Sequence, residues 1–156
     1  MDLMRWERIL AATDFSPLGN RAVVEAHVLA EKFGAELHVL HVVDNADGVA
    51  TQQGATGTLD IDEVATGPKA WLSELLGEKG TVRRVDAVQI GRDVADKILK
   101  YALAKEIDVI VLASHGRTGL ARIWLGSVAE KVVRSAQCPV LVLRSPAVTT
   151  ARTASG

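Results

Sequence analysis

Cysteine is almost absent from this chain of 156 residues, in which Cys138 stands alone. A single cysteine cannot form a disulfide within the chain, and this is typical of proteins from a reducing compartment. The sequence also lacks an apolar leader after Met1 and any apolar run long enough to cross a bilayer. We therefore expect a cytoplasmic protein that contacts no membrane.

The chain also lacks an excess of charge of either sign. Lys and Arg number 18 and Asp and Glu number 19, so the formal net charge is -1. A surface that binds nucleic acid needs clustered positive charge to neutralise phosphates, so we expect no nucleic-acid partner. Apolar residues, in contrast, make up 48% of the chain, which is enough for the core of one globular domain.

Short β-branched runs alternate with longer segments of helical period. The runs predicted to be strands cover residues 8–13, 36–43, 81–90, 107–114 and 139–144. Three of them are almost continuously apolar, as strands covered on both faces are. Five strands with a helix after each of the first four predict a doubly wound α/β domain. Its parallel sheet is expected to have the order 3-2-1-4-5, with helices on both faces.

The predicted helices each have one apolar face. The first is expected to begin with Ser16 as N-cap and Pro17 as first helical residue, and to end at Gly34. The apolar faces consist of Ala22, Ala26, Leu29 and Phe33 in the first helix, Trp71, Leu72, Leu75 and Leu76 in the second, Val94, Ile98, Leu99 and Ala102 in the third, and Val128, Val132, Val133 and Ala136 in the fourth.

Two stretches do not fit this alternation. Residues 44–58 are rich in Asp, Gly, Thr and Gln without an apolar period, which predicts a mobile loop. Residues 146–156 have too little apolar content to pack, which predicts a disordered tail. Residues 1–145 are therefore expected to form the single domain.

The loop after the fourth predicted strand, ASHGRTGLARIWLGS at residues 113–127, contains the main candidate site. Ligands of open α/β sheets bind beyond the carboxyl ends of the strands, where the strand order reverses. Gly116 and Gly126 have no side chain and can take dihedrals closed to other residues, which lets their N–H groups approach a ligand. Ser127 opens a helix whose free N–H groups and dipole favour an anion. Arg117 adds positive charge, so the loop suggests a phosphate-bearing ligand.

The same residues also have simpler explanations. Ser127 could cap the fourth helix while Glu130 reaches back in a capping box, and Gly116 could serve only a tight turn. Asp14, after the first strand, could satisfy loop N–H groups or contact a ribose. The loop matches neither the Walker pattern nor the dinucleotide fingerprint. The loop alone leaves these alternatives open.

No catalytic residue and no metal site are predicted. His115 has no partner carboxylate or nucleophile in the sequence. His38 and His41 point to opposite faces of one strand, which argues against a shared metal. Cys138 is expected to be inert packing.

In its motifs the chain resembles the universal stress protein family. The nucleotide-binding branch of that family has Gly, two residues, Gly, nine residues, and Gly followed by Ser or Thr. Gly116, nine residues and the pair Gly126 and Ser127 match, whereas Ala113 stands in place of the first glycine. The similarity also covers ILAATDFS, HVLHVVD and CPVLVLR, in the family's order.

The resemblance implies an adenine nucleotide site. It implies that Asp14 contacts the adenosine portion, that the backbone of Val42 holds the adenine, and that Ala113 lies by the ribose. The residues implied to line the same wall or to hold the phosphates are Ala12, Thr13, Gly116, Gly126, Ser127 and Val128.

The sequence thus predicts an ATP-binding regulator of the stress response. ATP is favoured over AMP because two separated anchors, Gly116 and the turn at Gly126 and Ser127, suggest an extended phosphate chain. Mg²⁺ would accompany it, held by phosphate and water, and hydrolysis would be slow. Two alternatives stay open: a slow ATPase or nucleotidyl-transfer enzyme that uses Asp14 or His115, and a nucleotide-free dimeric interaction module.

The last predicted strand suggests a partner. In the expected strand order, residues Pro139 to Arg144 form an apolar sheet edge, which tends to pair with another strand. In the family this strand often pairs with its own copy, so the resemblance implies a homodimer through Pro139 to Arg144. Alternatively, the tail covers this edge.

Overall fold

The computed structural model describes residues 5–44, 70–77, 81–116 and 125–145. Nearly all of the predicted mobile loop at 44–58, the whole predicted tail at 146–156, and Arg117 lie outside the described residues. The predicted domain boundaries therefore stay predictions.

Five parallel strands form one sheet in the order β3-β2-β1-β4-β5, which confirms the predicted topology. The strands are β1 (Arg8–Thr13), β2 (Glu36–Val43), β3 (Arg84–Ile90), β4 (Val109–Ala113) and β5 (Val140–Leu143). The bounds of β1 and β2 are those predicted, whereas the other three strands are shorter than their predicted segments. Just before β4, the Asp108 carboxylate accepts the N–H groups of Glu7 (2.7 Å) and Arg8 (2.8 Å), which joins the two central strands at their amino ends.

The helices are α1 (Pro17–Phe33), a helix over residues 70–76, α3 (Val94–Ala104) and α4 (Ser127–Ser135). The predicted ends of α1 are confirmed. The Ser16 hydroxyl accepts the N–H of Gly19 at 3.1 Å, and Gly34 ends the helix with a left-handed φ of 64°. The N-cap of α3 is Asp93, which the sequence analysis did not single out and whose carboxylate accepts the N–H of Asp96 at 2.9 Å.

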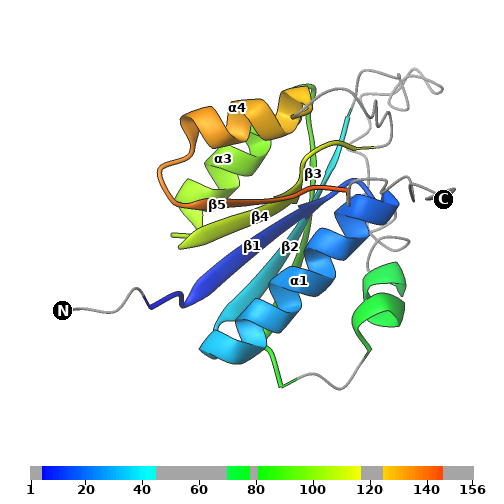
Figure 1. Cartoon of the computed structure of the whole chain (residues 1–156), viewed down its shortest axis with the longest axis vertical. Helices are drawn as coiled ribbons and strands as arrows, with labels where there is room; N and C mark the ends of the chain where they lie inside the picture. Colours follow the sequence, from blue (N-terminus) through cyan, green and yellow to red (C-terminus); the bar gives the residue numbers. More distant parts are fainter. Residues whose placement is uncertain (1–4, 45–69, 78–80, 117–124, 146–156) are drawn as a thin grey trace, which may run out of the picture.

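Helices cover both faces of the sheet (Figure 1). The helix α1 and the helix over 70–76 lie on one face, and α3 and α4 lie on the other. Because successive strand residues point to opposite faces, β1 directs Ile9 and Ala11 toward α1 and Leu10 toward α3. The doubly wound α/β class is therefore confirmed. None of the helices in the described part of the chain is both long enough and apolar enough to cross a membrane.

Three residues predicted to lie on buried helix faces are exposed: Phe33, Val133 and Leu75, the last of which is 37% exposed. Phe33 is 46% exposed, and its ring packs against Trp6 with 4.9 Å between the centroids. Val133 is 45% exposed because the fully buried position of α4 belongs to Val132. Adjacent helical residues differ by about 100° around the axis, so the two valines cannot both face the sheet.

Candidate functional site at the carboxyl edge of the sheet

A cleft of about 480 Å³ opens at the carboxyl ends of β1, β2 and β4. The first turns of α1 and α4 lie at this same edge (Figure 1). In this strand order the chain reverses direction across the sheet between β1 and β4, which is where open α/β sheets bind ligands. Every predicted binding residue that the structure describes lines the cleft: Ala12, Thr13, Asp14, Val42, Ala113, Gly116, Gly126, Ser127 and Val128.

The carboxylate of Asp14 lies between two glycines. Its Oδ1 accepts the N–H of Ser16 at 3.0 Å, so the predicted loop-stabilising contact is present. A β-carbon placed on Gly19 would lie 2.7 Å from Oδ1, and one placed on Gly116 would lie 2.2 Å from Oδ2. Both distances are far shorter than a normal contact, so the position of the carboxylate depends on the absence of a side chain at both residues.

This geometry corrects the predicted reason for Gly116. The sequence analysis expected a glycine there because of dihedrals closed to other residues. Among the described glycines, however, a positive φ occurs at Gly34 and Gly77 and not at Gly116. Gly116 is required for space beside Asp14 and not for its backbone conformation.

The backbone after Asp14 is in an unusual conformation. Phe15 has a φ of 61°, a left-handed value that bulky residues rarely adopt. Its N–H donates to the Thr13 hydroxyl at 3.0 Å, and its ring lies 4.3 Å from the His41 ring and 4.9 Å from the Trp71 ring, centroid to centroid. His41 also lines the cleft. The sequence analysis missed the roles of Phe15 and His41, because no local pattern indicates a left-handed phenylalanine.

The first turn of α4 presents backbone donors to the cleft. The first bond of this helix runs from the N–H of Glu130 to the carbonyl of Gly126, at 2.9 Å. The N–H groups of Ser127, Val128 and Ala129 therefore have no acceptor within the helix, and all three residues line the cleft. Together with the positive end of the helix dipole, they favour an anion.

One alternative explanation and one prediction about this turn are wrong. Ser127 is the first helical residue and not the cap: the N-cap is Gly126, which has no side chain to bond, and the Glu130 carboxylate pairs with Arg134 at 2.6 Å. The N–H of Gly126, which was expected to approach a ligand, donates instead to the carbonyl of Ser114 at 2.6 Å. Gly126 thus ties the start of α4 to the end of β4 and leaves the donor role to the next residues.

Apolar side chains complete one wall of the cleft. Leu40 and Leu112 contribute from the sheet, and Val94 and Ile98 contribute from α3. The sequence analysis missed all four as site residues, because their apolar positions fit a core equally well. The cleft therefore combines an apolar wall, the carboxylates of Asp14 after β1 and Asp44 after β2, and a helix N-terminus.

The histidines of this region have local partners. The Nδ1 of His115 lies 3.0 Å from the hydroxyl of Ser114, which is fully buried. His38 and His41 lie on opposite faces of β2, as predicted: His38 bonds the Tyr101 hydroxyl of α3 at 2.8 Å, whereas His41 contacts Phe15. Within the described ranges, no three residues of the types His, Cys, Asp and Glu are placed to hold a metal ion together.

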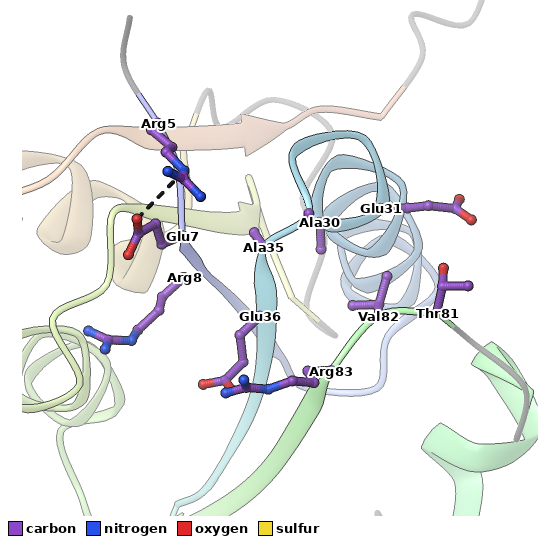
Figure 2. Close-up of a pocket in the computed structure, with 11 residues that line it drawn as sticks. Arg5, Glu7, Arg8, Ala30, Glu31, Ala35, Glu36, Thr81, Val82 and Arg83 are labelled. Atoms are coloured by element: carbon purple, nitrogen blue, oxygen red, sulfur yellow. Dashed lines mark hydrogen bonds and ion pairs between the residues drawn. The ribbon is translucent and has the colours of Figure 1, made fainter. Parts of the chain in front are cut away.

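A second cavity, of about 520 Å³, lies at the opposite, amino edge of the sheet (Figure 2). Five of its six charged side chains form ion pairs: Glu36 with Arg83, Arg5 with Glu7 at 3.6 Å, and Arg8 with Glu106, outside the cavity, at 3.2 Å. This cavity is similar in size to the carboxyl-edge cleft, but none of the described residues that line it belongs to the first turn of a helix. We therefore place the candidate site at the carboxyl edge.

Comparisons with known proteins agree over almost the whole chain. The model of the universal stress protein family matches residues 5–144. Universal stress protein MJ0531 of Methanocaldococcus jannaschii is 34% identical over 154 residues, which cover 90% of this chain and 84% of that protein.

Solved structures share the fold. The structure of the protein MJ0577 superposes with a TM-score of 0.73 at 26% identity and covers 91% of this chain and 98% of its own. A universal stress protein solved in complex with cAMP has a TM-score of 0.67 at 18% identity and covers 90% of this chain and 98% of its own.

Proposed function

The chain belongs to the universal stress protein family, and we propose that its carboxyl-edge cleft binds an adenine nucleotide, with ATP as the preferred ligand. The observation that carries this proposal is that Asp14 and the first residues of α4, whose N–H groups have no acceptor within the helix, line the same cleft. A carboxylate can accept hydrogen bonds from sugar hydroxyls, and the N–H groups at a helix N-terminus can donate hydrogen bonds to phosphate.

The phosphates would lie at the α4 end of the cleft. The N–H groups of Ser127 and Val128 supply donors there, and no carboxylate follows them until Glu130, which pairs with Arg134. Gly116 leaves space for the Asp14 carboxylate on the β4 side. We propose that Arg117 adds charge from the same loop, and that Mg²⁺ binds through phosphate oxygens and water.

The adenosine would lie at the β1 and β2 end of the cleft. The Asp14 carboxylate would accept a ribose hydroxyl, and the backbone of Val42 would hold the base. Ile98 and Leu40 offer an apolar wall of the kind that flat aromatic ligands require. Ala113, which replaces a family glycine, also lines the cleft, at the end of β4.

The volume agrees with a ligand of this size. Sites for small molecules and cofactors usually enclose about 300–1,000 Å³, and the cleft encloses about 480 Å³. The crystallised family member in complex with cAMP is evidence that a protein of this fold can hold an adenine nucleotide; for this chain the proposal depends on the cleft itself.

We propose that the bound nucleotide regulates the protein and is hydrolysed slowly or not at all. The Nδ1 of His115, the candidate base, is hydrogen-bonded to the buried Ser114 hydroxyl. A hydroxyl, unlike a carboxylate, does little to make the imidazole a stronger base toward water. A homodimer would present the regulated surface. In support of it, β5 is an edge strand and Leu141 is 42% exposed. A cytoplasmic location stays a prediction.

Two measurements test nucleotide binding. The purified protein is denatured, and the released small molecules are identified by mass spectrometry; we expect an adenine nucleotide. Calorimetry with Mg²⁺ and either ATP or GTP should then show one site per chain with a preference for ATP. The absence of any adenine nucleotide, together with no heat on addition of ATP, would favour the nucleotide-free interaction module.

A further inference from the structure

The residues on both sides of Asp14 contact one imidazole. The His41 ring packs in a tilted orientation against the Phe15 ring, with 4.3 Å between centroids and 42° between ring planes. Its Nδ1 lies 2.9 Å from the Thr13 carbonyl oxygen. A carbonyl oxygen can only accept, so the Nδ1 of His41 carries the proton and donates. His41 thus contacts the chain immediately before and immediately after the carboxylate.

The left-handed backbone of Phe15 explains why such an anchor is needed. A phenylalanine prefers negative φ values, and a left-handed bulky residue persists only where the surrounding structure holds it. Here the Phe15 ring has two ring contacts: one with His41, and one with Trp71, which meets it edge-on with 71° between the ring planes. If Phe15 relaxed to a negative φ, the direction of Asp14 would change with it.

The position of Asp14 has little tolerance. Its carboxylate lies between the α-carbons of Gly19 and Gly116, where even one added carbon atom would collide with it. A rotation of the backbone at Thr13 or Phe15 would move the carboxylate out of this slot. The contacts of His41 with Thr13, before Asp14, and with Phe15, after it, restrict that rotation.

We infer that His41 is a positioning residue for nucleotide recognition, which fixes the Asp14 carboxylate where it can accept a ribose hydroxyl. This inference rests on the proposed function. It makes His41, and the ring of Phe15 between His41 and Trp71, determinants of sugar specificity. A role limited to packing would affect stability but not the preference among sugars.

The test compares ATP with 2′,3′-dideoxy-ATP, which lacks both hydroxyls that a carboxylate could bind. We expect the unmodified protein to bind ATP about tenfold or more tightly, the usual effect of a hydrogen bond to a charged group. His41→Phe keeps a ring against Phe15 but loses the Nδ1 donor, and His41→Asn keeps a donor but loses the ring. Both variants should bring the ratio of the affinities for ATP and the dideoxy analogue to within about threefold. They should do so by weakening the binding of ATP while the binding of the analogue stays almost unchanged.

Two further variants separate positioning from stability. His38→Gln, on the same strand but facing α3, should lower the melting temperature and leave the ratio unchanged. Phe15→Gly has no ring, but glycine adopts a positive φ without strain. This variant should therefore fold and yet lose the preference for ATP over the dideoxy analogue. An unchanged ratio in folded His41 variants or in Phe15→Gly would overturn the role of His41 while leaving nucleotide binding intact. Equal binding of both ligands by the unmodified protein would overturn it as well, whereas binding of neither would refute the proposed function.

Discussion

The carboxylate of Asp14 lies directly against the α-carbon of Gly116, so that a β-carbon on residue 116 would come within 2.2 Å of Oδ2. One residue follows β1 and the other follows β4, the two strands between which the strand order reverses. The contact therefore joins the two halves of the sheet at the point where a ligand is expected. It also means that the smallest side chain at residue 116 would displace the carboxylate.

Gly116→Ala is expected to weaken ATP binding by about tenfold or more, because Asp14 must rotate away from the ribose. Calorimetry measures the affinity, and circular dichroism at increasing temperature measures the stability, which should change little. Gly126→Ala is the matched control. Its nearest contact, to the carbonyl oxygen of Ser114, would be 3.3 Å, which a small shift can accommodate. Equal losses in the two variants would contradict this account of Gly116.

Ser127→Pro tests one backbone donor of α4, the N–H of residue 127. Proline is favoured at the first position of a helix, and it removes one N–H without breaking the helix. Gly126 has a φ of -68° and a ψ of 163°, an extended conformation of the kind that precedes proline. We expect an affinity loss for ATP of about tenfold. Ser127→Ala, which keeps the N–H and loses only the hydroxyl, should lose less; the reverse order would show that the hydroxyl and not the amide binds.

Gly126→Glu places a negative charge beside the expected phosphates. Its β-carbon would lie 3.3 Å from the Ser114 carbonyl oxygen, which a small shift can relieve, so the variant should fold. We expect ATP binding below the detection limit of calorimetry because the carboxylate repels the phosphates. Gly126→Gln has the same size without the charge and should retain part of the affinity. If the two variants bind ATP equally well, charge at this turn is irrelevant and the phosphates lie elsewhere.

Much of the fold was predictable because strand and helix patterns are local. The run from Arg8 to Thr13 is almost continuously apolar, and the structure buries it on both faces. Less predictable were the ends of β3, β4 and β5, which depend on hydrogen bonds between strands. The burial of single helix positions was also less predictable, since Val132 and Val133 are equally apolar and only one can face the sheet.

The site was predictable as a set of residues but not as a set of interactions. The loop glycines and Asp14 were visible as motif positions. That the N–H of Gly126 bonds the Ser114 carbonyl, and that Gly116 serves Asp14, depends on contacts between segments far apart in the sequence. The same is true of His41, whose contacts with Thr13 and Phe15 span more than 20 residues.

Cys138 is expected to react slowly with thiol reagents in the folded protein. Burial raises the pKa of its thiol above the ordinary value, so that less thiolate is present near neutral pH. Alkylation by iodoacetamide at about pH 7.5, followed by mass spectrometry, should be several-fold faster in urea than in buffer. Equal rates in the two solutions would show that the folded protein does not protect the Cys138 thiol, which would contradict a role limited to packing.

Glu36 gives the stability of this protein a defined dependence on acid. A hydrogen bond from Arg83, which lies beside Glu36 (Figure 2), lowers the pKa of the Glu36 carboxyl below its ordinary value of 4.5. A hydrogen bond with His38 adds to the effect. Because the pKa is lower in the folded state than in the unfolded state, the carboxylate stabilises the fold above pH 4.5. That stabilisation is lost as the pH falls further, through the folded-state pKa.

Glu36→Gln should therefore lower the melting temperature at neutral pH, and the gap to the unmodified protein should narrow as the pH falls from 4.5. The effect should be modest and weaken with salt, since the Arg83 side chain is 84% exposed. Glu31→Gln, an exposed carboxyl of the same cavity, is the control and should leave the pH profile unchanged. A gap that stays constant from neutral to acid pH would mean that Glu36 stabilises the fold through its shape and its neutral hydrogen bonds, because only a titrating charge can make the difference between the two proteins depend on pH.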